Sequence, residues 1–182
     1  MEAVKIHLVA TILLVQFASY DRVPYFPTEI SRSAASSPNA LNMMRIGFTT
    51  LLMTLYATDQ FSVPVSILWV GLMIVAFVPD TLSLGGHMVG VALIFVAASL
   101  QCLAREGNGA HLLGLGVFLY FLRIAMKYYA FVNLVDDPLT PFMEWNRRIM
   151  FGELNPGPNI LPWFRMSATM QWTAFWAWSH LF

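Results

Sequence analysis

Apolar residues fall into six runs of helical length, separated by polar stretches. The runs cover about residues 3–19, 42–58, 65–78, 85–104, 110–135 and 163–181. Roughly 20 helical residues cross a bilayer core, and helices satisfy their own backbone hydrogen bonds there. The pattern therefore predicts an all-α fold, a polytopic membrane helix bundle with about six transmembrane helices. The whole chain, residues 1–182, is predicted to form a single transmembrane domain.

Two polar stretches are longer than the others, residues 20–41 and residues 136–163. Six spans would place both extramembrane loops on the same side of the bilayer. These loops carry more Lys and Arg than the short ones, so the positive-inside rule predicts that they face the cytoplasm. The second loop is predicted to contain a short amphipathic helix near residues 142–151, lying on the bilayer surface.

The composition supports a membrane location and excludes other classes. The chain is 58% hydrophobic and only 11% charged, whereas soluble domains carry about 25% charged residues. The formal net charge is zero, which argues against nucleic-acid binding, since that function needs a clustered basic face. The first run resembles a secretory signal, with Lys5 before it and small residues at 18–19, but we interpret it as the first membrane helix.

No motif for catalysis, metal binding or cofactor binding is present in the sequence. There is no Gly-x-Ser-x-Gly, no His-Glu-x-x-His and no glycine loop of the kind that cradles phosphates. The lone Cys102 excludes an internal disulfide or a metal site of several cysteines. We therefore predict no catalytic residues, no metal and no cofactor, and lean against an enzyme.

Arg123 and Lys127 are the most costly residues of the predicted spans. They stand four apart, hence on one helical face. A charge at membrane depth costs roughly 2.5–3.5 kcal/mol on insertion scales and usually faces a partner or a wet cavity. One interpretation is a cationic clamp for a lipid phosphate. In the other, the membrane segment ends near Leu122 and both side chains reach the interface, beside Tyr128 and Tyr129.

The first polar loop, residues 22–37, is dense in hydrogen-bonding groups and contains Glu29, Ser31 and Arg32. We interpret these three residues as lipid-headgroup candidates together with the two cations of the fifth run. The alternative is that the stretch is a solvated connector, because loops are polar by default.

His87 opens the fourth run within a Gly-His-Met-Val-Gly sequence. It is a further headgroup candidate, although a structural histidine is the alternative, because no second His lies at metal-ligand spacing. Gly86 and Gly90 form a Gly-x-x-x-Gly pair, which predicts close packing against another helix. The last run holds four tryptophans, which predict a surface facing a protein partner or lipid: Trp163, Trp172, Trp176 and Trp178.

The order of these features resembles the six-helix DRAM/Frag/Sfk-like membrane protein family. The resemblance rests on Pro24-Tyr25 leading to residues 30–34 in the first loop, on His87 with Gly90, and on Gln171-Trp172 in the last run, where the family has Glu-Trp. It implies an endomembrane protein acting in lipid remodelling, lipid-kinase regulation or autophagy. The inserted residues 26–29 and the predicted cytoplasmic side of the loop differ from the family pattern.

Two functions from different classes follow. The first is a lipid-remodelling or lipid-regulatory multi-pass membrane protein, with membrane lipids as partners. The second is an accessory structural subunit of a large membrane complex, for example in an energy-transducing membrane, with protein partners on the tryptophan-rich helix. The sequence leaves open whether the host is an endomembrane or an organellar inner membrane.

Overall fold

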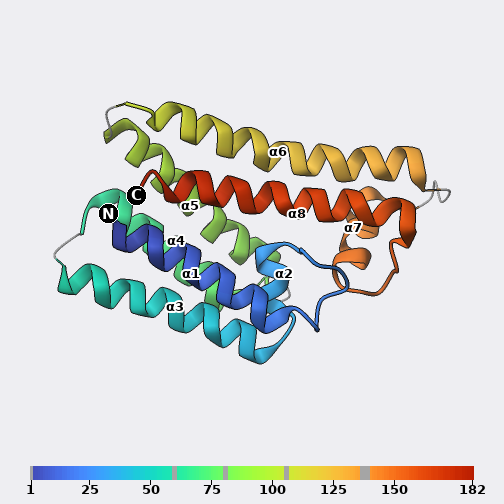
Figure 1. Ribbon diagram of the computed structural model, residues 1–182, viewed down its shortest axis with the longest axis horizontal. Coiled ribbons are helices and arrows are strands. Elements are labelled where there is room, and N and C mark those ends of the chain that lie inside the picture. The colour runs from blue at the N-terminus through green and yellow to red at the C-terminus, as the bar shows by residue number, and fades with distance from the viewer. Residues whose placement is uncertain (1, 59–60, 80–81, 105–106, 136–139) are drawn as a thin grey trace.

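The computed structural model describes residues 2–58, 61–79, 82–104, 107–135 and 140–182. Within these residues the chain forms eight helices and no strand (Figure 1). The helices are α1 (Glu2–Ser19), α2 (Ile30–Ala35), α3 (Pro38–Ala57), α4 (Val63–Phe77), α5 (Leu84–Ala104), α6 (Gly109–Leu134), α7 (Phe142–Met150) and α8 (Gly157–Ser179). The prediction of an all-α fold is confirmed.

Each of the six predicted apolar runs coincides with one long helix, and two of these helices are long and apolar enough to cross a membrane. These two are α5 and α6, judged by length and composition alone. Shorter apolar helices cover Lys5–Ser19 within α1 and Val63–Phe77, which is α4.

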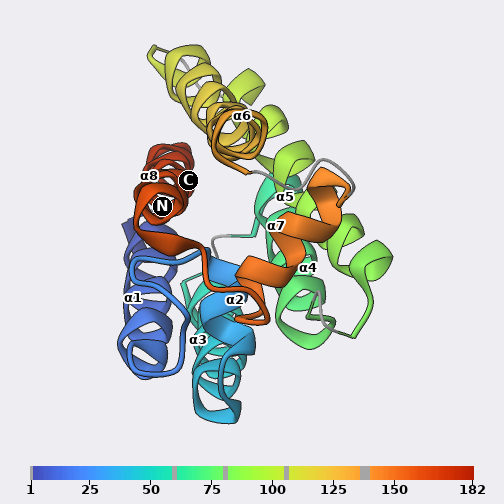
Figure 2. The ribbon, with the colours of Figure 1, turned by 90° about the vertical axis from the view of Figure 1, so that its right-hand side faces the viewer.

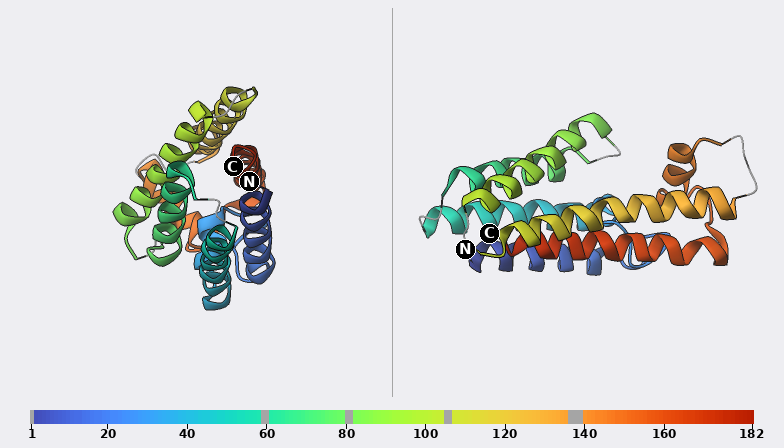
Figure 3. Two further views of the ribbon diagram at one scale, coloured as in Figure 1. Left: turned by 90° about the vertical axis from the view of Figure 1, so that its left-hand side faces the viewer. Right: turned by 90° about the horizontal axis from the view of Figure 1, so that it is seen from above.

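The long helices follow one another around a ring. Neighbouring contacts run from α1 to α3, α4, α5, α6 and α8, and α8 returns to α1. The end view of Figure 2 shows this arrangement, and Figure 1 shows the two termini close together at one end. At the other end α6 and α8 extend beyond α1 and α3, and α7 packs on α6 there (Figures 1 and 3).

Local sequence signals explain where α3 and α4 begin. The Ser37 hydroxyl accepts a hydrogen bond from the Ala40 amide at 3.1 Å, and Pro38 occupies the first helical position. Ser62 caps α4 in the same way, by accepting from the Val65 amide at 3.4 Å. Both caps satisfy an amide that has no partner within the helix, and proline is well tolerated in a first turn.

The two polar loops of the prediction are shorter than expected because prolines start helices in them. Helix α3 begins at Pro38, inside the predicted loop 20–41, and α8 begins at Gly157, inside the predicted loop 136–163. Residues 30–35 form the short helix α2. The amphipathic helix expected near residues 142–151 is present as α7, with Trp145 and Ile149 buried.

The first polar segment (residues 20–37, between α1 and α3) and the second polar segment (residues 140–156, before α8) pack against each other. They meet at the end where α6 and α8 extend beyond the other helices. Tyr25 from the first segment joins Trp145 of α7 and Phe164 of α8 in one buried cluster. The ring centroids of Tyr25 and Phe164 are 5.5 Å apart, and those of Trp145 and Phe164 are 5.4 Å apart. This cluster supports the buried polar groups described next.

Candidate functional site

A buried ion pair joins the first polar segment to α6. The Lys127 ammonium donates to the Glu29 carboxylate, and the two side chains are only 6% and 1% exposed. The two residues are 98 positions apart in sequence. The ammonium also lies 4.7 Å from the centre of the Phe164 ring and 3.7 Å from the sulfur of Met150. Lys127 is therefore held by groups from three other segments of the chain.

Two hydroxyls of the first segment also bind the Glu29 carboxylate. The Tyr25 hydroxyl donates to Oε2 at 2.6 Å, and the Thr28 hydroxyl donates to the same oxygen at 3.3 Å. Both carboxylate oxygens are thus hydrogen-bonded, as a buried charge requires.

The backbone around Glu29 is fastened to α8 and α1 by side chains. The Gln171 side-chain oxygen accepts from the Ile30 amide at 3.0 Å, and the Trp172 indole donates to the Thr28 carbonyl at 3.0 Å. From α1, the Gln16 side chain donates to the same carbonyl at 3.2 Å and also to the Ser33 hydroxyl. The first polar segment is therefore a fixed part of the fold, rather than a solvated connector.

Replacing Trp172 with Phe tests this fastening. The variant loses one hydrogen bond to the Thr28 carbonyl, which still accepts from Gln16. We expect the free energy of unfolding to fall by about 0.5–1.5 kcal/mol, the usual net value of one hydrogen bond. Equilibrium unfolding in mild detergent would measure the change. An unchanged midpoint would show that the indole nitrogen contributes nothing to holding the segment.

The surroundings of Glu29 favour its charged form. Burial alone would raise its pKa, but the charge and hydrogen bond of Lys127, with the hydrogen bond from Tyr25, outweigh burial and hold the pKa below its ordinary value of 4.5. The pKa of Tyr25 is raised, first by burial and then by the adjacent carboxylate. At neutral pH the site therefore contains a carboxylate and a neutral phenol.

The lowered pKa of Glu29 predicts a direction for acid destabilisation. Since the folded pKa lies below the unfolded one, the contribution of this carboxylate to stability is complete above pH 4.5 and is lost as the pH falls through the folded value. A series of unfolding midpoints against pH in detergent would measure the loss. Glu29→Gln should show a smaller fall on the acid side, and an identical fall would contradict the assignment.

Arg123 lies one helical turn before Lys127 and forms no ion pair within the described residues. Its positive charge adds a small contribution to the lowered pKa of Glu29, after those of Lys127 and Tyr25. The guanidinium carbon lies 4.2 Å from the centre of the Tyr120 ring. Its Nε is buried and finds no hydrogen-bond acceptor in the described part of the chain.

We call this group of six side chains the polar junction: Tyr25, Glu29, Arg123, Lys127, Ser167 and Gln171. Ser167 belongs to it because it lies on the face of α8 that also carries Phe164 and Gln171, three and four residues away. Ser167 is fully buried, and its hydroxyl has no partner among the described residues.

Three of the six headgroup candidates, Glu29, Arg123 and Lys127, meet in the polar junction, whereas Arg32 and His87 lie elsewhere. The guanidinium of Arg32 lies 4.6 Å from the centre of the Phe151 ring, just after α7. Ser31 is in α2, and its side chain falls outside the part that the structure describes. The ring of His87 is within 3.1 Å of the Val78 carbonyl, so His87 belongs to the contact between α4 and α5.

The two glycines of α5 differ in their neighbours. A Cβ placed on Gly90 would lie 2.9 Å from the Gly71 carbonyl oxygen, so the backbones of α4 and α5 touch at this point. A Cβ on Gly86 would lie 2.9 Å from a methyl group of Val78, so there a side chain, rather than backbone, is the nearest neighbour.

The tryptophans of α8 do not share one outward surface. Trp178 is only 3% exposed and packs on Phe95, with ring centroids 4.6 Å apart, so the expectation that it faces a partner is wrong. Trp172 is half-buried and hydrogen-bonded to the first segment, and Trp163 lies on Tyr129 with ring centroids 4.9 Å apart. Trp176 is 53% exposed.

Sequence reasoning missed the roles of Gln16, Thr28 and Ser167, and it noticed Gln171 only through the family resemblance. Gln16 and Gln171 carried a signal, because each is an amide within an apolar run and both are buried. A buried amide requires a hydrogen-bond partner, which here is the first polar segment.

The polar junction holds neither a catalytic triad nor a metal site. No cluster of three His, Cys, Asp or Glu side chains exists within the described residues. Comparison of the chain with protein-family models, with curated proteins and with solved structures found no match in any of the three.

Proposed function

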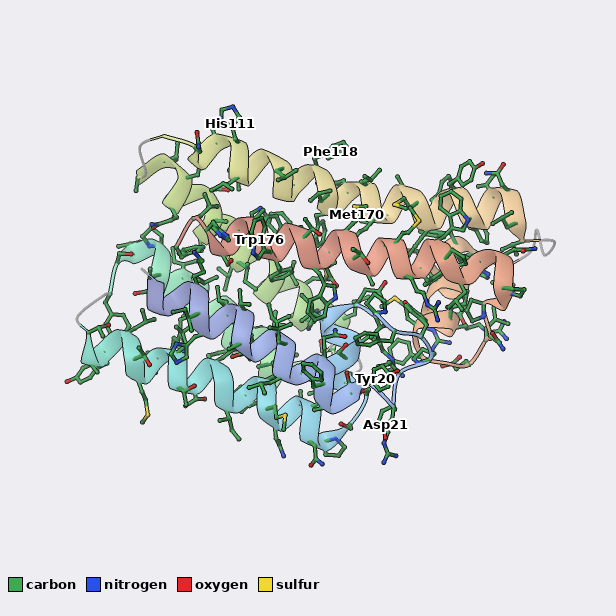
Figure 4. The ribbon with its side chains drawn as sticks, in the orientation of Figure 1. Tyr20, Asp21, His111, Phe118, Met170 and Trp176 are labelled. Carbon is green, nitrogen blue, oxygen red and sulfur yellow. The ribbon has the colours of Figure 1, made fainter. Side chains whose placement is uncertain are left out.

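We propose that the chain is a multi-pass membrane protein of about six spans that binds a lipid headgroup at the polar junction. The observation that best supports a membrane location is that the apolar side chains of α6 are exposed on its outer face. The most apolar part of this helix is only 17% buried. Figure 4 shows Phe118 pointing away from the bundle. Other exposed large side chains of α6 are Leu115, Phe121, Ile124 and Val132.

An apolar helix that is mostly exposed is typical of lipid contact. The core helix of a soluble protein would be apolar and mostly buried, and monomeric soluble proteins rarely expose large contiguous apolar patches. The other helices of the ring show the same character, because exposed large apolar residues occur on α1, α3 and α5 as well. This favours six spans over two.

The polar junction then lies near one membrane surface. It is formed where α1 ends and α3 begins, and α7 packs nearby. Tyr128 and Tyr129 are exposed on α6 directly after Lys127, five and six residues after Arg123, and tyrosine favours the headgroup region. An arginine without an acidic partner among the described residues, at this level, suits recognition of a charged lipid headgroup. This agrees with the lipid-related function that the resemblance to the DRAM/Frag/Sfk-like family implies.

Cysteine labelling across the membrane tests the number of spans. In a Cys102→Ser background, Asp21→Cys and Thr58→Cys should label from opposite sides if α3 crosses the membrane. They should label from the same side if only α5 and α6 cross. Asp21→Cys and Asn155→Cys should label from one side in either case, which makes this pair the internal control. Release of the protein from membranes by alkaline carbonate would overturn the membrane assignment itself.

Native mass spectrometry of the full chain in gentle detergent tests lipid binding. We expect a mass near 20.5 kDa with a retained phospholipid.

The accessory-subunit function is the second candidate, favoured by the exposed Trp176 beside an apolar groove of about 260 Å³ between α1 and α8. A much larger mass with a fixed set of partner proteins would support that function instead.

A further inference from the structure

The two cations of the polar junction have different environments. Lys127 is paired with Glu29, so these two charges cancel. Arg123 has no acidic partner within the described residues, which leaves the junction with one net positive charge. The buried Nε–H of Arg123 also has no acceptor there. A buried donor without an acceptor is rare in native proteins and points to a group that is bound from outside the chain.

A second unused polar group lies at the same level on α8. Helices α6 and α8 run antiparallel, because Lys127 of α6 faces Phe164 and Gly116 faces Trp178. On α6, Arg123 is four residues before Lys127, in the direction of Gly116. On α8, Ser167 is three residues after Phe164, in the direction of Trp178. The two residues therefore lie opposite each other. The Ser167 hydroxyl is fully buried and has no partner in the described chain.

The position along α6 brings Arg123 within reach of the bilayer surface. Arg123 is five residues before Tyr128, an exposed tyrosine of α6, which corresponds to about 7.5 Å along the helix at 1.5 Å per residue, and tyrosine favours the headgroup region. Arg123 is partly exposed, whereas Lys127 is buried. A long cationic side chain at this depth can extend toward the phosphate layer.

Resting on the proposed membrane function, we infer that Arg123, with the hydroxyl of Ser167, binds a phosphate group, while Lys127 only holds the first polar segment in place. The guanidinium fork matches two phosphate oxygens and gives strong charge-assisted hydrogen bonds. Stacking on Tyr120 restricts the guanidinium plane. The hydroxyl supplies one further donor, and the single excess positive charge favours an anionic ligand over a zwitterionic one.

The test uses the full chain in nanodiscs of phosphatidylcholine, with and without phosphatidic acid. Bound phosphatidic acid would be counted by native mass spectrometry after release from the disc. We expect Arg123→Gln to weaken binding about tenfold to a hundredfold, the effect of losing one or two hydrogen bonds to a charged group. Arg123→Lys should bind at an intermediate level, because it keeps the charge but not the fork. Ser167→Ala should weaken binding severalfold.

Arg165→Gln is the matched control, because Arg165 is exposed on α8 and lies outside the junction. Should Arg123→Gln fail to fold, Arg123→Lys and Ser167→Ala still decide the question. Unchanged phosphatidic acid binding in folded Arg123 and Ser167 variants would overturn the inference, although lipid binding itself would stand. Absence of any bound lipid in the unmodified protein would overturn the proposed function as well.

A further measurement distinguishes a lipid phosphate from a soluble phosphate as the ligand. Inorganic phosphate added to nanodiscs without phosphatidic acid should leave the unfolding midpoint unchanged if the ligand is a lipid. A midpoint that rises with inorganic phosphate in the unmodified protein, and not in Arg123→Gln, would support phosphate recognition at Arg123 and assign it to a soluble phosphate.

Discussion

Lys127→Met is expected to lower the free energy of unfolding by about 3–5 kcal/mol, the usual cost of removing one partner from a buried ion pair. Methionine keeps most of the length and apolar contact of the lysine stem. The change therefore leaves the Glu29 carboxylate buried without its counter-charge, although Tyr25 and Thr28 still donate to it. Reversible unfolding in mixed detergent micelles would measure the loss.

Two further variants test whether the loss of stability comes from leaving a buried charge without its partner. Glu29→Gln combined with Lys127→Met removes both charges, and we expect it to be more stable than Lys127→Met alone, because no unpaired charge remains. Arg147→Ala removes an exposed cation that contacts Glu144 and Glu153. Exposed pairs contribute little, so this control should shift the midpoint far less. Equal effects of Lys127→Met and Arg147→Ala would contradict the structural role of the buried pair.

The same variants bear on the proposed function. If Lys127 only fastens the first polar segment, the double variant should keep its phosphatidic acid binding, since Arg123 and Ser167 are untouched. Stability and binding would then respond to different residues of one helix turn. This separation is the main consequence of finding Lys127 paired with Glu29 and Arg123 without an acidic partner among the residues that the structure describes.

The helices were predictable because apolar runs of about 20 residues leave few alternatives to helix. Their starts were less predictable where prolines occur. The predicted loops 20–41 and 136–163 include Pro38 and Pro158, yet each proline lies in the first turn of a helix, where it loses no intrahelical hydrogen bond. The proposed membrane position rests on composition and exposure, and the ring of helices alone would not require it.

The site was predictable only one side chain at a time. Arg123 and Lys127 stood out because charge is costly in an apolar run. Nothing in the sequence indicated that Lys127 would pair with Glu29, 98 residues away, because such a contact depends on how α6, α8 and the first segment pack. The tryptophan prediction failed for a local reason. Trp176 and Trp178 are two residues apart, so they point to nearly opposite sides of α8, and only Trp176 is exposed.

Gly90→Ala is expected to destabilise the contact between α4 and α5 by about 1–3 kcal/mol, the usual cost of overpacking. A Cβ on Gly90 would lie 2.9 Å from the Gly71 carbonyl oxygen, and a Cβ on Gly71 would lie 2.8 Å from the Gly90 carbonyl oxygen. Both neighbours are backbone atoms, which cannot move aside as a flexible side chain can. The helices must therefore separate, and the packing of buried Leu72 of α4 and Ile94 of α5 would loosen with them.

Gly85→Ala is the matched control in the same helix, because a Cβ at Gly85 meets nothing within 4 Å. Alanine has the higher helix propensity, by about 1 kcal/mol in a helix interior, so Gly85→Ala should be neutral or slightly stabilising. Unfolding midpoints of the two variants in one detergent measure the difference directly. If Gly90→Ala proved as stable as Gly85→Ala, the two backbones would not be in contact at Gly90. His87, one turn away from Gly90 and bonded to Val78 of the same hairpin, would then lack the close helix contact that buries it.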